Sequence, residues 1–440
     1  VLGGMRSVTW TQVAQYIILI TSYLVPVVVL SWQLFSNPVP QLAYGKVLQL
    51  NNQSALAITR DPQEKATREI WKAEAAAADA KIKDPATSAE EKVKLTAASK
   101  TAATQAKAPA ASDEATIGNY LTVPKGKGMW NFLALTFCLM VGTAGLPHIL
   151  ARYYTTPSVR EARTSVGWSL FFIFLLYFTA PAYAAFARFS VYTKLVGSKI
   201  ADLPSWVTLW KPAGLFDVID KAGDGIVQLA DFVIKSSDFV VLATPEIAGL
   251  PFVVTGLIMA GGLAAALSTA DGLLLTIANG ISHDLYYKVI NPQATLIRRL
   301  TITKIFLIVT ALIAAYVATF RLAIIVELVA WAFSLAGSSF FPALVMGIWW
   351  KRTNKAGALA GMVTGLAVTL FYMIGSRFYG MSWFGTATVA SGVFGLPLGF
   401  IVIWIVSLLT PAPDKATQDL VVSVRYPKTG SASAAINAGH

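Results

Sequence analysis

The sequence predicts an all-α integral membrane protein. Of its 440 residues, 55% are hydrophobic and 13% are charged, and that charged share is about half of what a soluble domain usually carries. Long stretches carry no charge at all, and a helix needs about 20 apolar residues to cross the hydrocarbon core of a bilayer. Helices are expected rather than strands because lipid offers no hydrogen-bond partner to an open sheet edge.

Eight apolar stretches define the predicted membrane helices. In chain order they occupy residues 10–35, 128–147, 164–187, 247–282, 305–320, 328–350, 356–376 and 381–411. The chain is therefore divided into a first membrane helix (1–37), an Ala/Lys-rich insertion (38–127), two membrane helices (128–190), a second polar loop (191–246), three membrane helices (247–350), two more (351–413) and a tail (414–440).

Basic residues in alternate short loops indicate the orientation. Three loops carry most of them: Arg152, Arg160 and Arg163; Lys288, Arg298, Arg299 and Lys304; and Lys351, Arg352 and Lys355. Because such loops face the cytoplasm, we expect a multi-pass protein of the plasma membrane, in bacteria the inner membrane. Both ends of the chain and the tail then lie inside, and the insertion and the second polar loop lie outside. Basic charge spread over alternate loops also argues against a nucleic-acid partner.

The insertion at 38–127 differs in composition from the rest of the chain. It holds 23 of the 58 charged residues, 13 of them basic and 10 acidic. Helix propensity is high from Glu64 to Lys83, but no apolar stripe recurs there that would pack the helix against a neighbour. We expect a solvated helical or disordered segment without chemistry, with a partner-binding arm as the alternative.

The second polar loop contains DKAGDGIVQLAD, which fits part of a calcium-loop template. Asp220 takes position 1, Asp224 position 5, the Ile226 carbonyl position 7 and Asp231 position 12 around a central glycine. Calcium requires oxygen ligands at alternate positions of such a turn. However, Ala222 takes position 3, and the last position has Asp in place of the longer Glu. A weak calcium site and a plain Asp-Gly turn both stay open, and the turn is favoured.

The fourth membrane helix holds the strongest cation-site candidates. Ala265, Ser268 and Thr269 stand at i, i+3 and i+4 and share one face, so a carbonyl and two hydroxyls form an oxygen-only ligand set that suits sodium. Alternatively, the hydroxyls bond back to the preceding turn or pack against another helix. Asp271 on the same helix must be paired, protonated or facing water. It is a candidate for cation attraction, proton carriage or a structural bond.

The second membrane helix contains Gly142, Gly145 and Pro147 within six residues. Gly and Pro weaken a helix and release backbone groups, and transporters place such broken helices at the substrate site. A proline kink with small residues that allow close packing is the equal alternative. The sequence shows no nucleophile beside a base, no phosphate-binding glycine loop and no paired carboxylates. We therefore expect no enzyme activity and no resident cofactor.

Together these segments resemble the sodium:solute symporter family, and within it the cation/acetate, or monocarboxylate, branch. Five stretches carry the resemblance: GGMRSVTWTQVAQ, GTAGLPHILARYYTTPSVREAR, ATPEIAGLPFVVTGL, GGLAAALSTADGLLLTIANGISHDLYYK and FFPALVMGIWWKRTNKAGA. The resemblance implies a leucine-transporter-like fold of inverted repeats. The eight helices would be the last eight of that fold, the final two peripheral, in a chain that begins inside a longer protein.

The resemblance also implies site residues. The sodium site would use Ala265, Ser268 and Thr269. The substrate segment would lie around Gly142, Thr143 and Gly145, and Trp331 and Phe340 would line the same cavity. Many family members have an acid where this chain has Gln12, so Asp271 is the replacement acid to consider.

The expected function is secondary active symport that couples sodium or proton entry to uptake of acetate or another short monocarboxylate. The alternatives are a solute sensor of the same fold without net transport, and a symporter of the family for a different small solute. The expected partners are the monocarboxylate, sodium or protons, and the lipid bilayer. Sodium would be the coupling ion, and the sequence predicts no oligomeric state.

Overall fold

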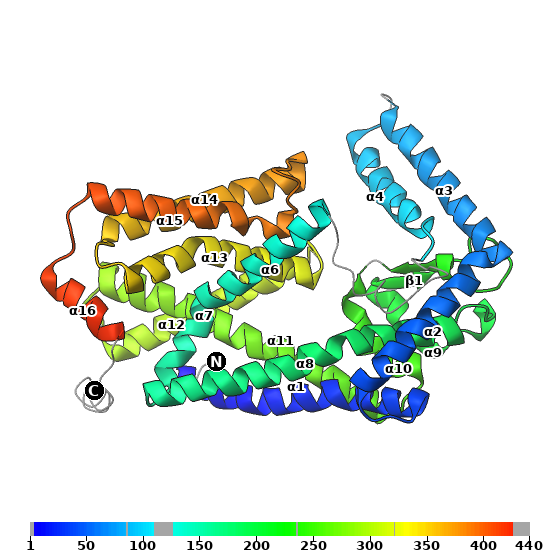
Figure 1. The fold of residues 1–440 in the computed structure, drawn as a ribbon, viewed down its shortest axis with the longest axis horizontal. Coiled ribbons are helices and arrows are strands. Elements are labelled where there is room, and N and C mark those ends of the chain that lie inside the picture. The colour runs from blue at the N-terminus through cyan, green and yellow to red at the C-terminus, as the bar shows by residue number, and fades with distance from the viewer. Residues whose placement is uncertain (1–3, 85–86, 110–125, 235, 321, 426–440) are drawn as a thin grey trace. The chain divides into compact units, whose positions relative to one another are not determined.

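The computed structural model describes residues 4–84, 87–109, 126–234, 236–320 and 322–425. Within these ranges eight helices are long and apolar enough to cross a membrane, which confirms the all-helical membrane architecture. They comprise α1 (Gly4–Phe35), α6 (Lys127–Gly145), α8 (Val159–Lys194), α11 (Phe252–Asn279), α12 (Leu296–Ala318), α13 (Ile325–Trp349), α14 (Lys355–Tyr379) and α15 (Gly392–Leu409) (Figure 1). Residues 110–125 of the insertion and 426–440 of the tail lie outside the described ranges.

Shorter elements connect these helices. The α-helices are α2 (Pro40–Arg60), α3 (Pro62–Lys83), α4 (Ala89–Gln105), α7 (Pro147–Leu150), α9 (Ser205–Trp210), α10 (Val240–Ala248) and α16 (Lys415–Arg425). Single turns are η1 (Ala151–Thr155), η2 (Ile200–Asp202), η3 (Lys211–Ala213), η4 (Leu229–Asp231), η5 (Ser237–Phe239) and η7 (Thr388–Ala390), and α11 continues into the π-helix η6 (Gly280–Ile290). Strands β1 (Phe216–Val218) and β2 (Phe232–Ile234) pair antiparallel, with Phe216 opposite Ile234.

The chain divides into two compact units. Unit 1 comprises Val1–Ala14, Val123–Leu170 and Ala266–His440, and unit 2 comprises Gln15–Thr122 and Phe171–Ala265. The long helices α1, α8 and α11 contribute residues to both units. Each unit is described by itself.

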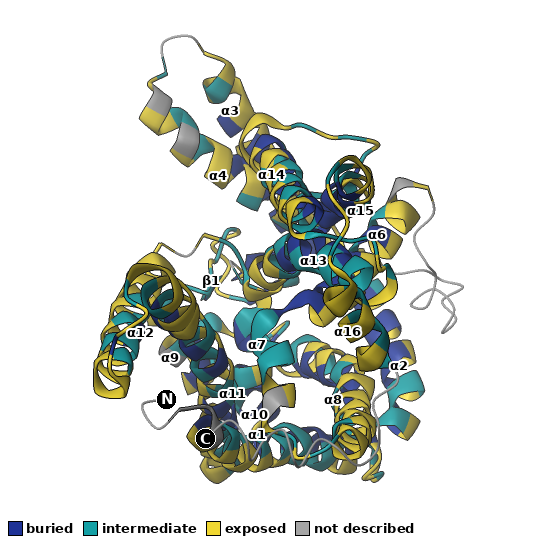
Figure 2. Ribbon diagram, turned by 90° about the vertical axis from the view of Figure 1, so that its left-hand side faces the viewer, coloured by how far each residue is buried: buried dark blue, intermediate teal, exposed yellow. Residues whose placement is uncertain are grey.

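Small residues bring the helices of unit 1 together. A Cβ atom on Gly365 of α14 would collide with the Ser338 carbonyl of α13, and one on Gly395 of α15 would collide with the Gly365 carbonyl. In a membrane the hydrophobic effect does not drive helices together, so close backbone approach of this kind supplies the packing. The final two spans, α14 and α15, therefore pack directly on α13, whose buried residues lie between Ala330 and Pro342 (Figure 2).

Helix α12 is the opposite case. Leu307 is its buried residue, whereas Leu312 and Tyr316 are 66% and 67% exposed. An apolar helix that exposes most of its side chains suits a hydrocarbon surrounding. The apolar composition of α12 after Lys304 and its exposure in the structure thus agree.

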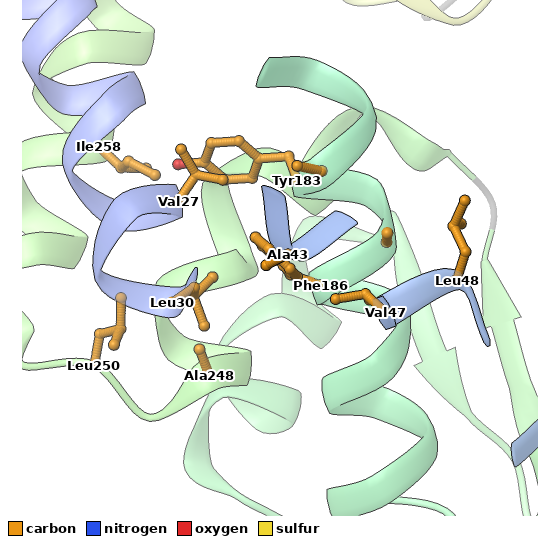
Figure 3. Packing of buried hydrophobic residues seen from close by; sticks show 12 residues of the cluster. Val27, Leu30, Ala43, Val47, Leu48, Tyr183, Phe186, Ala248, Leu250 and Ile258 are labelled. Carbon is orange, nitrogen blue, oxygen red and sulfur yellow. The ribbon is translucent and has the colours of Figure 1, made fainter. Parts of the chain in front are cut away.

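The core of unit 2 joins the first membrane helix to the start of the insertion. Val27 of α1, Val47 of α2 and Phe186 of α8 are fully buried in one cluster (Figure 3). Phe35 stacks on Phe186 with ring centroids 5.9 Å apart. The Asn51 side-chain amide of α2 donates to the Ala185 carbonyl of α8 over 2.9 Å. The insertion therefore begins as a packed helix.

The remainder of the described insertion is helical and mostly exposed, as one of the expected forms, but it also has a packing partner that the sequence did not indicate. Helices α3 and α4 form a hairpin (Figure 1), and Trp71 and Ala102 bury against Ala230 and Val233 of the second polar loop. Ala side chains let the helices approach closely, and the loop supplies the apolar partner. A narrow contact of this kind leaves no apolar stripe in the sequence of a single helix.

Candidate cation and solute site

The segment with the predicted sodium ligands lies in the uninterrupted helix α11. At about 100° per residue, Ala265, Ser268 and Thr269 fall within roughly one third of the helix circumference. Ala265 and Ser268 are half-buried, and Thr269 is exposed. The Ser268 carbonyl accepts a hydrogen bond of 2.7 Å from the side-chain amide of Gln12 on α1. The structure thus keeps the predicted face intact and places the amino-terminal part of α1 beside it.

Asp271 lies next to Ser268 on the same helix. The two residues are three positions apart, so their directions differ by about 60°, whereas the directions of Asp271 and Thr269 differ by about 160°. Asp271 is half-buried. Its part in cation binding, proton carriage and a structural bond all stay predictions.

Next to Asp271, Gly272 opens a space into which nitrogen-bearing side chains project. A Cβ atom on Gly272 would lie 3.4 Å from Arg152 Nη2, 3.8 Å from Gln12 Nε2 and 3.9 Å from His148 Cδ2. Burial and the nearby Arg152 charge lower the pKa of His148 below its usual value. A neutral imidazole, an amide and one guanidinium thus meet at this turn of α11.

The predicted break in the second membrane helix is present. Helix α6 ends at Gly145, Leu146 is extended with φ −73° and ψ 117°, and α7 begins at Pro147. Proline lacks the N–H that would pair with the Thr143 carbonyl four residues earlier. The Leu146 carbonyl accepts from the Ile149 and Leu150 N–H groups at 3.1 and 3.2 Å. The break therefore leaves carbonyl oxygens at the end of α6, where the helix dipole is negative.

The glycines of this segment serve close packing. A Cβ atom on Gly142 would lie 2.5 Å from the Phe333 carbonyl oxygen of α13, and one on Gly145 would lie 3.0 Å from the Ala336 carbonyl oxygen. Thr143 is exposed, and its hydroxyl donates to the Leu139 carbonyl over 2.7 Å. Gly142 and Gly145 thus hold the broken helix against α13, which was the alternative interpretation of these residues.

Trp331 and Phe340, the two residues predicted to line the solute cavity, both lie on α13. They are nine residues apart in the continuous helix α13, so they point in opposite directions, about 180° apart. The Trp331 ring lies under the Arg377 guanidinium, 5.6 Å from its carbon. Both residues are half-buried. Their expected place beside the substrate stays a prediction.

The calcium-like loop folds into turns capped by its own carboxylates. Asp220 accepts from the N–H groups of Gly223 and Gly225 at 2.7 and 3.1 Å, and Asp224 accepts from that of Ile226 at 2.9 Å. Asp231 is buried and accepts from the Lys221 and Gln228 N–H groups. Within the described ranges, no three His, Cys, Asp or Glu residues are grouped as metal ligands. Calcium binding at Asp220, Asp224, Ile226 and Asp231 stays a prediction.

One buried structural carboxylate was missed by the sequence analysis. Glu64 of α3 is 1% exposed and forms an ion pair with Arg68 one turn later. Its two oxygens accept from the Leu229 N–H at 2.7 Å and the Ala230 N–H at 3.1 Å. Glu64 thus caps η4 and fastens the insertion to the second polar loop. The Glu–Arg spacing of i, i+4 was the available signal, and it is common on solvated helices as well.

The comparisons with known proteins agree with the sequence resemblance. The profile of the sodium:solute symporter family matches residues 226–365. An uncharacterized symporter of Cupriavidus necator is 44% identical over an alignment of 473 positions, which covers 96% of this chain and 69% of the relative. A monocarboxylic acid transporter of Corynebacterium glutamicum is 28% identical over 290 positions, which cover 63% of this chain and 46% of that protein.

Among solved structures, the chain is similar to a Na+-coupled sialic acid symporter in a substrate-bound outward-open state. The TM-score is 0.42 at 16% sequence identity, with 92% of this chain and 76% of the other covered.

Proposed function

Because the chain belongs to the sodium:solute symporter family, we propose that it couples the entry of sodium to the uptake of acetate or another short monocarboxylate. The similarity to the monocarboxylic acid transporter of Corynebacterium glutamicum supports this substrate class. The family is one of transporters, in agreement with the expectation that the chain is not an enzyme.

The observation that carries the proposal is the intact oxygen face of α11. Ala265, Ser268 and Thr269 stay on one side of a continuous helix, and a carbonyl with two hydroxyls suits a hard cation such as sodium. The end of α6 adds carbonyl oxygens freed by Pro147, and a helix carboxyl end favours positive charge.

The anionic solute needs donors or a positive charge. The N–H groups of Ile149 and Leu150 are occupied by the Leu146 carbonyl, so the start of α7 offers few donors. The guanidinium of Arg152 beside Gly272 supplies a positive charge, and a bound sodium ion would supply a second one. Entry of one cation with one monoanion is electroneutral. Any additional cation would make uptake respond to the membrane potential, by about 2.3 kcal/mol per charge per 100 mV.

The test is uptake of labelled acetate into proteoliposomes with and without an inward sodium gradient at fixed pH. We expect sodium-dependent uptake in the wild type and its loss in the Ser268→Ala/Thr269→Ala variant. Thr276→Ala is the matched control, because this hydroxyl on α11 bonds to its own helix at the Gly272 carbonyl (2.8 Å).

Two other outcomes are informative. Uptake that is independent of sodium but driven by a pH gradient would support symport with protons in place of sodium. Asp271 would then be the candidate proton carrier. Absence of acetate uptake under either gradient would leave family membership intact and refute the monocarboxylate assignment.

A further inference from the structure

Unit 2 contains a cavity of about 530 Å³ that none of the predicted site residues lines. Tyr23 of α1, Ala184 and Arg188 of α8, and the aromatic side chains of the second polar loop form its walls. Its volume falls within the range of about 300–1,000 Å³ that is typical of small-molecule sites.

The loop side of the cavity is an aromatic wall. Trp206, Phe232 and Phe239 each contact Phe216, with ring centroids 5.7, 5.6 and 5.5 Å apart. All four residues are at most 6% exposed. Mutually packed rings make a rigid apolar surface, and such a surface favours the apolar part of a ligand.

Arg188 is the one charged residue among those that line the cavity. Among the described residues no Asp or Glu lies within ion-pair distance of it. It is exposed and lies six residues before the end of α8 at Lys194. An unpaired guanidinium at the edge of an apolar cavity attracts a carboxylate and offers it two parallel hydrogen bonds.

We propose that this cavity binds monocarboxylates with an apolar tail, the carboxylate on Arg188 and the tail against Trp206 and Phe216. The inference rests on the proposed monocarboxylate function and extends it, because it adds a second site that prefers longer tails than that of acetate. A mostly apolar lining with one cationic group is complementary to an anion that carries an apolar tail.

The test measures equilibrium binding of labelled acetate, butyrate and hexanoate to the protein in lipid nanodiscs without sodium. We expect hexanoate to bind at least ten-fold more tightly than acetate, because tail methylenes leave water. Arg188→Gln should weaken hexanoate binding at least ten-fold, and Arg188→Lys should retain most of it. Arg163→Gln, an exposed arginine on the same helix, is the matched control and should bind as the wild type does.

A second variant tests the cavity itself. Ala184→Trp places a large ring at an exposed position of the lining and should block hexanoate while leaving the unfolding temperature unchanged. The proposal is overturned if acetate and hexanoate bind equally, if Arg188→Gln binds as the wild type does, or if hexanol competes as well as hexanoate.

The failure of this proposal is distinguishable from the failure of symport. If hexanoate binds in an Arg188-dependent way while no carboxylate is taken up, the transport assignment is wrong and the site stands. If sodium-driven acetate uptake is present but carboxylate binding depends neither on the length of the tail nor on Arg188, the transport assignment stands and this second site does not exist.

Discussion

The side-chain amide of Gln12 donates to the Ser268 carbonyl over 2.7 Å, across 256 positions of the sequence. The family resemblance implies an acid at the position of Gln12, and the neutral amide found there contacts the backbone of the predicted cation segment. The contact fixes the start of α1 beside the hydroxyl face of α11. It also brings a side-chain donor to a backbone carbonyl of the continuous helix α11.

The Gln12→Ala variant tests this contact. Loss of one hydrogen bond changes a free energy by about 0.5–1.5 kcal/mol, so we expect the sodium concentration for half-maximal uptake to change roughly two- to ten-fold. Thr11→Ala is the control, because that hydroxyl bonds to the Ser7 carbonyl of its own helix. An unchanged sodium dependence in Gln12→Ala would show that the contact is structural only.

Gly142→Ala is expected to destabilise the protein. The added methyl group would lie 2.5 Å from the Phe333 carbonyl oxygen, and overpacking of this kind costs about 1–3 kcal/mol. The matched control is Gly167→Ala on α8, where a Cβ atom meets nothing within 4 Å. Thermal unfolding in detergent should show a lower midpoint for Gly142→Ala alone, and equal midpoints for the two variants would contradict the packing.

Glu64→Gln should loosen the insertion. The change removes the charge that pairs with Arg68 and weakens the acceptor for the Leu229 and Ala230 N–H groups. Breaking a buried ion pair costs about 3–5 kcal/mol, so hydrogen exchange in α3 and α4 should rise at least ten-fold. Glu69→Gln is the control, because Glu69 is exposed and pairs weakly with Lys72 at 3.4 Å. Slow exchange in both variants would refute the role of Glu64.

Asp231 predicts a pH dependence of stability. Burial raises the pKa of its carboxyl from 3.8 to about 6, with contributions from the Asp220 and Glu64 charges. The folded state therefore binds the carboxyl proton of Asp231 more tightly than the unfolded chain does. The stability that this protonation adds is fully present below pH 3.8 and is lost as the pH rises through about 6. This difference in pKa between the unfolded and folded states corresponds to at most about 3 kcal/mol of stability.

The measurement is the difference in unfolding midpoint between the wild type and Asp231→Asn from pH 4 to pH 7.5. We expect it to favour the wild type most at pH 4 and to decline toward pH 7. Asp202→Asn, which changes an exposed carboxylate of the same loop, should show no such trend. A difference that grows with rising pH would contradict the raised pKa.

The sequence alone determined the features that depend on local composition. Charge-free segments of sufficient length predicted all eight spans, because a membrane helix must satisfy its backbone internally and present apolar side chains to lipid. Pro147 predicted the break after α6, since its missing N–H acts within one turn. The shared face of Ala265, Ser268 and Thr269 followed from helix geometry.

Only the tertiary structure decided which side chains meet. Glu64 finds its N–H partners 165 and 166 residues away, and no local pattern records such a partner. Gly142 and Gly145 proved to be contact points for α13, a choice that the break itself left open. The cavity beside Arg188 assembles from a polar loop and two long helices. These contacts depend on packing between segments that are distant in the sequence, where shape and burial select the partners. The periodicity of a single segment carries no information about which distant segment it will contact.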